Sequence, residues 1–207
     1  MEFSAIVESR HSVRQFDEGV GIDDAELEAI FAEVVLSPSS FNMQHWQFVV
    51  VRDTARKQQL RGLSYGQAQV EQCAAAILVC GRLDAHVDAA RIYGEEPAEV
   101  RDKYVPMIEG VYRDQPVLQR EEAIRSGALA AMSLMYAAKN RGWDTGPMIG
   151  FDAAKVAAML ELADNVVPVM LVVLGRAAGG RQPARGYRRP LSEVLHYERY
   201  QGGGAPA

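Results

Sequence analysis

Two arginines, a histidine and a serine lie within five residues near the start of the chain, in the order Arg10-His11-Ser12-Val13-Arg14. Arginine stays protonated at neutral pH, and its planar guanidinium presents a fork of donors that matches two oxygens of a phosphate. The serine hydroxyl can donate to a third oxygen. The segment therefore predicts a site for a phosphate-bearing ligand, and a solvated helix end is the alternative that it leaves open when taken alone.

A second polar segment, residues 37–46, reads Ser-Pro-Ser-Ser-Phe-Asn-Met-Gln-His-Trp and concentrates hydroxyl and amide side chains. A helix stop with local side-chain hydrogen bonds would explain it by itself. Beside the arginine segment, however, it supplies neutral donors and acceptors for a planar heterocycle. Loops on rigid elements are where such groups usually lie. The two segments thus complement each other, one for a phosphate and one for a ring.

The elements that must position these segments follow from capping residues and hydrophobic spacing. Residues 23–36 begin with acidic residues and continue with apolar residues at helical spacing, so they predict a helix. Residues 47–51 are typical of a strand, and residues 53–60 resemble a polar helix with an aspartate cap. The apolar runs 74–81 and 167–175 lack alternation, which predicts strands buried on both faces.

The middle of the chain holds one clear helix and one irregular region. Residues 119–142 are rich in Ala, Leu and Met, end at a glycine, and predict a long helix that is apolar nearly all round. Such a helix lies in a large core or at a subunit interface. Residues 93–116 contain three prolines and many charges, so we predict a partly exposed insertion that is neither clean helix nor strand. Few strands separated by helices indicate an α+β or mixed α/β class in one layered domain.

Composition limits the classes of partner and location. The 207 residues carry a formal net charge of −5, which gives no support to a nucleic acid or an anionic membrane as partner. Residues 1–10 lack a basic start and an apolar core, and no uncharged apolar run reaches the ~20 residues of a membrane helix. We therefore expect a cytoplasmic protein without a membrane partner. The Gly-rich end, residues 201–207, is expected to be an unstructured tail.

Several common kinds of site are absent from the sequence. Residues 175–180 lack the spacing and the following helix of a dinucleotide-binding turn, and no phosphate-loop string occurs. The four histidines are too scattered to suggest a metal site. Cys73 and Cys80 lie in apolar sequence, so we expect two buried thiols with neither a disulfide nor zinc.

Four segments, taken in order, resemble those of the FMN-dependent nitroreductase family. They are Arg-x-Ser-x-Arg from residue 10, Pro-Ser-Ser-x-Asn-x-Gln-x-Trp from residue 38, Gly-Pro-Met-Ile-Gly-Phe-Asp at 146–152 and Arg-Arg-Pro-Leu-Ser-Glu-Val at 188–194. Each is a weak signal alone, but together they are specific and span nearly the whole chain. His45 departs from the pattern, because the family commonly has proline before the tryptophan.

The resemblance implies a fold and an assembly. The fold would be α+β, with a mixed, mostly antiparallel central sheet flanked by helices in a single FMN-binding domain over residues 1–200. The protein would be a homodimer with two FMN molecules at the subunit interface, each contacted by both chains. The long helix would then form the core and the dimer contact, and an arm after residue 176 would be exchanged between subunits.

The resemblance also assigns cofactor-binding residues. The ribityl phosphate would be held by Arg10, Ser12 and Arg188, with His11 contributing through its backbone or ring, and Arg14 would lie nearer the pyrimidine. From the partner chain, the contacts would be Pro38, Ser39, Ser40 and Asn42. The backbone of Pro147, Met148, Ile149 and Gly150 would lie along the ring edge, and Gln67, with Gln69 as its rival, would reach the pyrimidine. Arg185 and Arg189 are alternatives to Arg188.

The implied activity is that of an oxidoreductase, a flavoprotein that passes electrons from NAD(P)H to nitroaromatic, quinone or related small acceptors by a ping-pong mechanism. Because the cofactor performs the chemistry, no catalytic side chain and no metal are expected. The alternatives are a flavin-binding or regulatory protein without turnover, or a specialised flavin dehydrogenase or dehalogenase on the same scaffold. Within the insertion, Tyr104, Met107 and Tyr112 are expected either to line the acceptor pocket or to pack ordinarily. The acceptor and the choice between NADH and NADPH stay open.

Overall fold

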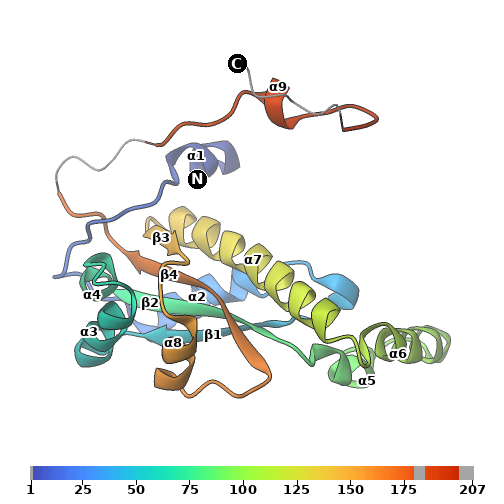
Figure 1. The fold of residues 1–207 in the computed structure, drawn as a ribbon. Helices are drawn as coiled ribbons and strands as arrows, with labels where there is room; N and C mark the ends of the chain where they lie inside the picture. The colour runs from blue at the N-terminus through green and yellow to red at the C-terminus, as the bar shows by residue number, and fades with distance from the viewer. Residues whose placement is uncertain (1, 180–184, 201–207) are drawn as a thin grey trace.

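A computed structural model of the chain describes residues 2–179 and 185–200. At its centre is a four-stranded sheet in the order β1-β2-β4-β3, in which all three strand pairs are antiparallel (Figure 1). The strands are β1 (Trp46–Val51), β2 (Ala75–Arg82), β3 (Asp144–Met148) and β4 (Val166–Gly175). A parallel bridge between Ser12 and Thr145 lays the N-terminal segment beside the edge strand β3. The predicted α+β class with a mostly antiparallel sheet is confirmed.

Helices and short helical turns fill the connections between these strands. The α-helices are α1 (Phe3–Ser9), α2 (Asp24–Val34), α3 (Thr54–Leu63), α4 (Gln69–Gln72), α5 (Ala89–Ile92), α6 (Ala98–Tyr112), α7 (Pro116–Asn140), α8 (Ala153–Met159) and α9 (Leu191–Val194). Two 3-10 turns, η1 (Ser40–Asn42) and η2 (Ala85–Asp88), follow α2 and β2.

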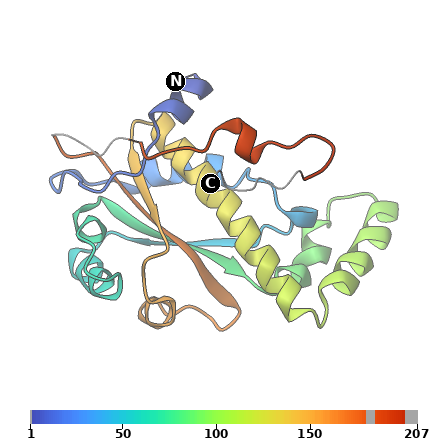
Figure 2. The same ribbon diagram turned by 45° about the horizontal axis from the view of Figure 1, so that its top comes forward.

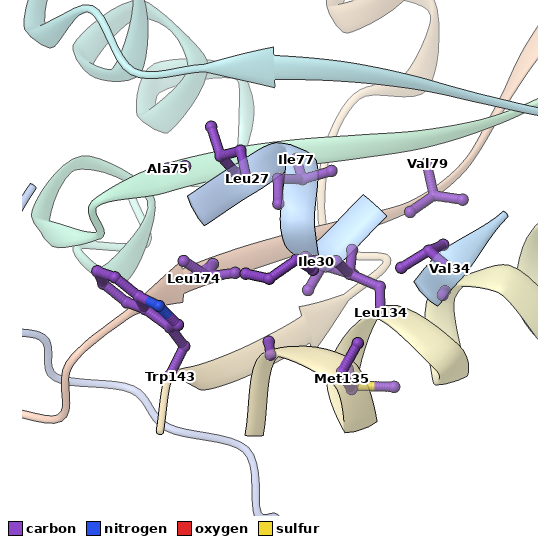
Figure 3. Close-up of a cluster of buried hydrophobic side chains, with 14 of the residues drawn as sticks. Leu27, Ile30, Val34, Ala75, Ile77, Val79, Leu134, Met135, Trp143 and Leu174 are labelled. Atoms are coloured by element: carbon purple, nitrogen blue, oxygen red, sulfur yellow. The ribbon is translucent and has the colours of Figure 1, made fainter. Parts of the chain in front are cut away.

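The sheet lies between two layers of helices. On one face, α2 and the long α7 enclose a core cluster that includes Ile77 and Val79 of β2 (Figure 3). On the other face, α3, α4 and α8 cover Leu78 and Cys80 of the same strand. Successive side chains of a strand point to opposite faces, so a strand covered on both sides needs apolar residues at every position. This explains why the sequence of β2 shows no alternation.

The helix and strand predictions that rest on local signals are confirmed to within a few residues. The predicted helix 23–36 is α2, and the Asp23 carboxylate caps it by accepting from the backbone N–H of Glu26 at 2.8 Å. The Asp53 carboxylate caps α3 in the same way, accepting from the N–H of Arg56 at 2.9 Å. Such caps satisfy donors that the first turn of a helix leaves free. The predicted helix 119–142 is α7.

The prediction for residues 93–116 is wrong, because most of this region is the regular helix α6. Two of its three prolines bound helices instead of breaking them: Pro97 is the N-cap of α6, and Pro116 is the first residue of α7, where its missing N–H costs nothing. Pro106 does lie inside α6. The helix continues past it and buries Ile108 and Tyr112, which offsets the lost backbone bond. The region is partly exposed, as expected.

The C-terminal arm, residues 185–200, runs outside the body of the molecule (Figures 1 and 2). It contains only one short helix, α9. Its large apolar and aromatic side chains are exposed to solvent: Tyr187, Leu191, Val194, Leu195, Tyr197 and Tyr200. The predicted tail, 201–207, lies outside the described residues. Within the described ranges, no helix combines the length and the apolar character needed to cross a membrane.

Candidate active site

The arginine segment 10–14 is fixed against strand β3. The backbone N–H of Val13 donates to the carbonyl oxygen of Thr145 at 3.0 Å, and the Val13 side chain is fully buried. In extended backbone, neighbouring side chains point to the opposite side. Ser12 and Arg14 are accordingly exposed on the side away from the core. Because Val13 is buried, Ser12 and Arg14 on either side of it are exposed on the same side of the segment.

A pocket of about 370 Å³ opens over this segment. Four arginines contribute to its lining, which consists of Arg10, His11, Ser12, Arg14, Arg185, Gly186 and Arg188. Burial lowers the pKa of Arg10, and the neighbouring charges of Arg185 and Arg188 lower it further. Neighbouring cations repel one another, and an anion that binds among them reduces this repulsion. The pocket therefore fits a phosphate.

Arg185 ties the arm to the end of helix α1. Its Nη2 atom lies 3.0, 2.8 and 2.7 Å from the carbonyl oxygens of Val7, Glu8 and Arg10, all of which accept from it. These carbonyls belong to the last turn of α1 and the residue after it, where oxygens lack helical partners and attract cations. Of the three arginines proposed for the phosphate, Arg185 and Arg188 line the pocket and Arg189 does not.

Residues 147–150 comprise the end of β3 and the two residues that follow it. Because Thr145 of β3 is bridged to Ser12, this stretch runs on from the contact with the segment that lines the pocket. The Nε2 of Gln67 donates to the carbonyl oxygen of Gly150 at 2.8 Å and to that of Ser64 at 3.1 Å. A Cβ on Gly150 would lie only 3.0 Å from this nitrogen, so a larger residue there would require the Gln67 amide to shift by a few tenths of an ångström. Gln69 donates from its own Nε2 to the Oε1 of Gln67 at 3.3 Å. The two candidate amides therefore both lie at this stretch.

A turn after α3 places Gln67 there, and it contains a residue that the sequence analysis missed. Tyr65 has a positive φ of 54°, and Gly66 follows with φ 73°. The Tyr65 side chain is 75% exposed, and its Cδ2 lies 4.0 Å from the Cβ position of Gly150. An exposed aromatic ring beside this backbone stretch is a candidate ligand contact. The feature of the sequence that could have indicated Tyr65 is its position next to a glycine that favours a turn.

The loop that carries Pro38 to Asn42 is strained. Phe41, Asn42 and Gln44 all adopt left-handed backbone conformations, with φ of 50°, 56° and 48°. Residues other than glycine rarely do so, and such strain persists only where surrounding contacts impose it. One contact is local, since the Ser39 hydroxyl accepts from the backbone N–H of Gln44 at 2.9 Å.

Three further contacts hold this loop to other elements. The Ser37 hydroxyl lies 2.7 Å from that of Ser133 on α7. Tyr112, at the end of α6, donates its hydroxyl to the Ser40 hydroxyl at 2.9 Å. Tyr93 donates to the Phe41 carbonyl oxygen at 3.3 Å. Tyr112 is only 2% exposed, so it packs under the loop instead of lining an open acceptor pocket.

His45, which stands where the resemblance predicts a proline, is accommodated by a buried polar network. Its side chain is 1% exposed, and its Nδ1 lies 3.3 Å from the hydroxyl of Ser126. Ser126 in turn donates to Glu122, which pairs with Arg125. Burial lowers the pKa of His45 to about 4, against the opposing influence of Glu122. The imidazole is therefore neutral at pH 7.

The two halves of the expected site do not meet within one chain. Arg10–Arg14, Gln67 and 147–150 lie together, at the end of the molecule where β3 meets the N-terminal segment (Figure 1). The loop 38–42, light blue after α2, lies elsewhere along α7 in both views (Figures 1 and 2). Among the described residues, no hydrogen bond joins this loop to either of the other segments.

The described part of the chain also limits the chemistry. It holds no group of three or more His, Cys, Asp or Glu side chains that could bind a metal ion. What it presents is a cationic pocket over the segment 10–14, with the glycine-containing backbone stretch 147–150 at the end of the neighbouring strand. These features are the ones expected of a protein that holds a phosphate-bearing cofactor on an α+β scaffold.

Comparison with known proteins agrees with this class. The model of the Nitroreductase family matches residues 7–176. MhqN of Bacillus subtilis, which is named as an NAD(P)H nitroreductase, is 37% identical over 203 residues, covering 95% of this chain and 98% of its own. Protein DrgA of Synechocystis is 36% identical and covers 93% of this chain and 94% of its own. The chain belongs to the nitroreductase family.

Solved structures support the same assignment. The Bacillus subtilis nitroreductase YdfN matches with a TM-score of 0.91 at 36% identity, covering 95% of this chain and 98% of its own. A nitroreductase of Exiguobacterium sibiricum, solved in complex with FMN, matches with a TM-score of 0.87 at 33% identity, covering 96% and 98%. The family predicted from four sequence segments is thus confirmed. The expected FMN and NAD(P)H agree with the names of these relatives.

Proposed function

We propose that this protein is an FMN-dependent oxidoreductase that passes electrons from NAD(P)H to nitroaromatic, quinone or related small acceptors by a ping-pong mechanism. The observation that carries the proposal is the four-arginine pocket over the segment 10–14, with the backbone stretch 147–150 at the end of the neighbouring strand. The FMN complex of the Exiguobacterium relative and the NAD(P)H nitroreductase name of MhqN support the choice of cofactor and electron donor.

In this proposal the pocket residues hold the phosphate of FMN. Arg10 and Arg188 supply guanidinium forks, Ser12 supplies a hydroxyl, and His11 contributes from its place in the lining. Arg14 lies nearer the pyrimidine, where a cation would favour negative charge on the ring. When bound, FMN supplies a ring that accepts hydride from NAD(P)H and delivers electrons to a second substrate. The chain's own residues bind and orient it.

The amides at the ring edge divide into two roles. Both N–H groups of the Gln67 amide donate to carbonyl oxygens of the chain itself. Gln67 therefore holds the 147–150 segment in place, and its donors are not free for a ligand. Gln69 donates from its Nε2 to the Oε1 of Gln67 at 3.3 Å and to the sulfur of Met148 at 3.9 Å, and it keeps its amide oxygen for a ligand. We thus favour Gln69, the alternative at the sequence level, as the side chain that contacts the pyrimidine.

The site is completed by a second copy of the chain. The loop with Pro38, Ser39, Ser40 and Asn42 lies apart from the pocket of its own chain, so it would serve the pocket of the partner. The exposed apolar arm residues and the exposed Ile124 and Leu129 of α7 supply surface that a homodimer would cover. In this assembly the arm is exchanged between subunits.

This arrangement needs no nucleophile or side-chain acid in the chain. With FMN bound, the nicotinamide and the acceptor would both have to reach the same ring, and each would occupy the site in turn. That order of events is a ping-pong mechanism. The residues around the ring then select acceptors by shape and exclude water.

The central test is spectroscopic. Purified protein should show the two-band absorption of a flavin, and the released cofactor should be FMN and not FAD. Anaerobic NADH or NADPH should bleach these bands, and a nitroaromatic, a quinone or an enone should restore them. Bound FMN that neither nucleotide bleaches would favour the alternative of a flavin-binding protein without turnover. A colourless protein that takes up no added FMN would contradict both.

A further inference from the structure

The strained loop at Phe41 to Gln44 depends on helix α6. Three left-handed residues within four positions cost on the order of 1–3 kcal/mol each, so contacts from outside the loop must hold them. Two of the outside contacts come from tyrosine hydroxyls in the region around α6, namely Tyr112 and Tyr93. Residues 93–116 therefore have a structural link to the loop proposed to meet the flavin.

The Tyr112 ring is buried and packs against three other rings. The ring lies edge-on to those of Phe41 and His45, with centroids 6.3 and 6.2 Å away, and stacks on that of His86 at 5.8 Å. It belongs to a small buried cluster with Met43 and residues of η2, α5 and α6. From this position the hydroxyl reaches the Ser40 hydroxyl at 2.9 Å.

The direction of this hydrogen bond matters for a ligand. A serine hydroxyl has one hydrogen to donate and two lone pairs that accept. Tyr112 is protonated at neutral pH, and its phenol is a stronger hydrogen-bond donor than the aliphatic hydroxyl of Ser40, so the tyrosine donates. When Tyr112 donates to Ser40, the hydrogen of Ser40 is free for another acceptor. Ser40 is only half-buried, so a ligand can reach it.

We propose that Tyr112, assisted by Tyr93, is a positioning residue that holds the loop 39–44 and orients the Ser40 hydroxyl as a hydrogen-bond donor toward the flavin of the partner subunit. The inference rests on the proposed function, because it takes FMN to be the ligand of Ser40. In this view the α6 region affects the flavin by holding the loop 39–44, and it needs no contact with the electron acceptor.

The test is a double-mutant cycle on FMN affinity. Apoprotein dimers of wild type, Tyr112→Phe, Ser40→Ala and the double variant are titrated with FMN while flavin fluorescence is followed. We expect Tyr112→Phe to raise the Kd about fivefold, the effect of one modest hydrogen bond. We expect Tyr112→Phe to add little in the Ser40→Ala background, because the tyrosine acts through that serine. Tyr93→Phe should raise the Kd in the same direction.

Tyr104→Phe is the matched control. It removes a hydroxyl from the same helix, where Tyr104 stacks on Tyr93, and that hydroxyl has no hydrogen-bond partner among the described residues. Its Kd should equal that of the wild type. An unchanged Kd in both Tyr112→Phe and Tyr93→Phe, with a raised Kd in Ser40→Ala, overturns this inference alone. So does a Tyr112→Phe effect of equal size in both backgrounds, which a general packing role would produce. A wild type that binds no FMN overturns the proposed function instead.

Discussion

The backbone of Val13 and the backbone of Thr145 are joined by a hydrogen bond of 3.0 Å, and this bond couples the cationic segment to the sheet. Gly146, the next residue on β3, packs closely against the backbone of Val13. A Cβ built on Gly146 would be 2.6 Å from the carbonyl oxygen of Val13, closer than real Cβ contacts come. The position of Ser12 and Arg14 therefore depends on a glycine more than 130 residues away in the sequence.

Gly146→Ala should damage stability and FMN binding together. The added methyl group meets backbone, which cannot rotate away, so β3 or the segment 10–14 must shift. Overpacking of this kind costs about 1–3 kcal/mol in the free energy of unfolding. The same shift displaces Ser12 and Arg14, so the Kd for FMN should rise as well. Chemical denaturation of the apoprotein and FMN titration measure the two effects.

Gly110→Ala on α6 is the control for this substitution. Apart from its chain neighbours and the backbone of its own helix, no atom lies within 4 Å of its Cβ position, and alanine is favoured over glycine inside a helix. It should leave FMN affinity unchanged and leave stability equal or slightly higher. If Gly146→Ala behaves like Gly110→Ala in both measurements, the backbone contact does not position the segment.

Arg10→Ala should weaken FMN binding strongly. The substitution removes a charge-assisted donor pair, and hydrogen bonds to charged groups contribute roughly 1.5–3 kcal/mol. The Kd should rise by about 10- to 150-fold, and the loss should shrink at high ionic strength. Equilibrium titration at two salt concentrations measures this. Arg101→Ala, on the exposed face of α6, removes the same charge away from the pocket and should bind FMN as the wild type does.

Local signals account for what the sequence predicted well. The strands β2 and β4 are unbroken apolar runs, and the helices α2 and α3 begin at aspartates that cap them in the structure. Such features depend on neighbours in the chain, so they can be identified without tertiary information. The ligand segments were identified because their residue types are unusual together, although their grouping came from the family resemblance.

Features that depend on tertiary packing were not predicted. Prolines made residues 93–116 look irregular, whereas Pro97 and Pro116 lie at helix starts. The bond between Tyr112 and Ser40 joins side chains 72 residues apart, and no pattern in either segment indicates it. Likewise, no pattern in the sequence indicates that the Gln67 amide donates to the carbonyl oxygens of Ser64 and Gly150. In each case the deciding contact comes from an element distant in sequence.

Truncation before Arg185 should disrupt dimerisation and FMN binding together. It removes the exposed apolar side chains that are proposed to cover the partner, and it removes two arginines from the pocket lining. Analytical ultracentrifugation and FMN titration report the two losses. Truncation after Tyr200 removes only the end of the chain and serves as the control. A dimer without the arm that retains FMN normally would show that neither the assembly nor the site needs it.

Cys73 and Cys80 should be unreactive in the folded protein. Both side chains are buried, at 1% and 0% exposure, and burial raises their pKa values to about 11 and about 12. The thiolate is the reactive form, so at pH 8 neither accessibility nor ionisation favours reaction. A chromogenic disulfide reagent should detect no thiol in the native protein and two after denaturation in guanidinium. Rapid labelling of one thiol before unfolding would contradict the burial of Cys73 after α4 or of Cys80 in β2.

His45 should make the protein less stable as the pH falls from about 6.5 to about 4. Its pKa is about 4 in the folded chain, and the ordinary value of 6.5 applies when the chain unfolds. Between these values the unfolded chain binds more protons, so the free energy of unfolding decreases as the pH decreases. The full effect of one such group is on the order of 3 kcal/mol. The facing charges have opposite effects on this pKa, because Glu122 raises it while His86 and Arg82 lower it.

His45→Asn should reduce this pH dependence. Asparagine keeps a polar atom near the position of Nδ1, so the contact with Ser126 can be retained without a titrating ring. Its free energy of unfolding should therefore follow that of the wild type from pH 8 to 6.5 with a constant offset, and then fall less steeply toward pH 4. Denaturant titrations of both apoproteins at half-unit pH intervals measure the two slopes. Parallel curves down to pH 4 would mean that His45 can take up its proton in the folded state and that the network with Ser126 and Glu122 adapts to the charge.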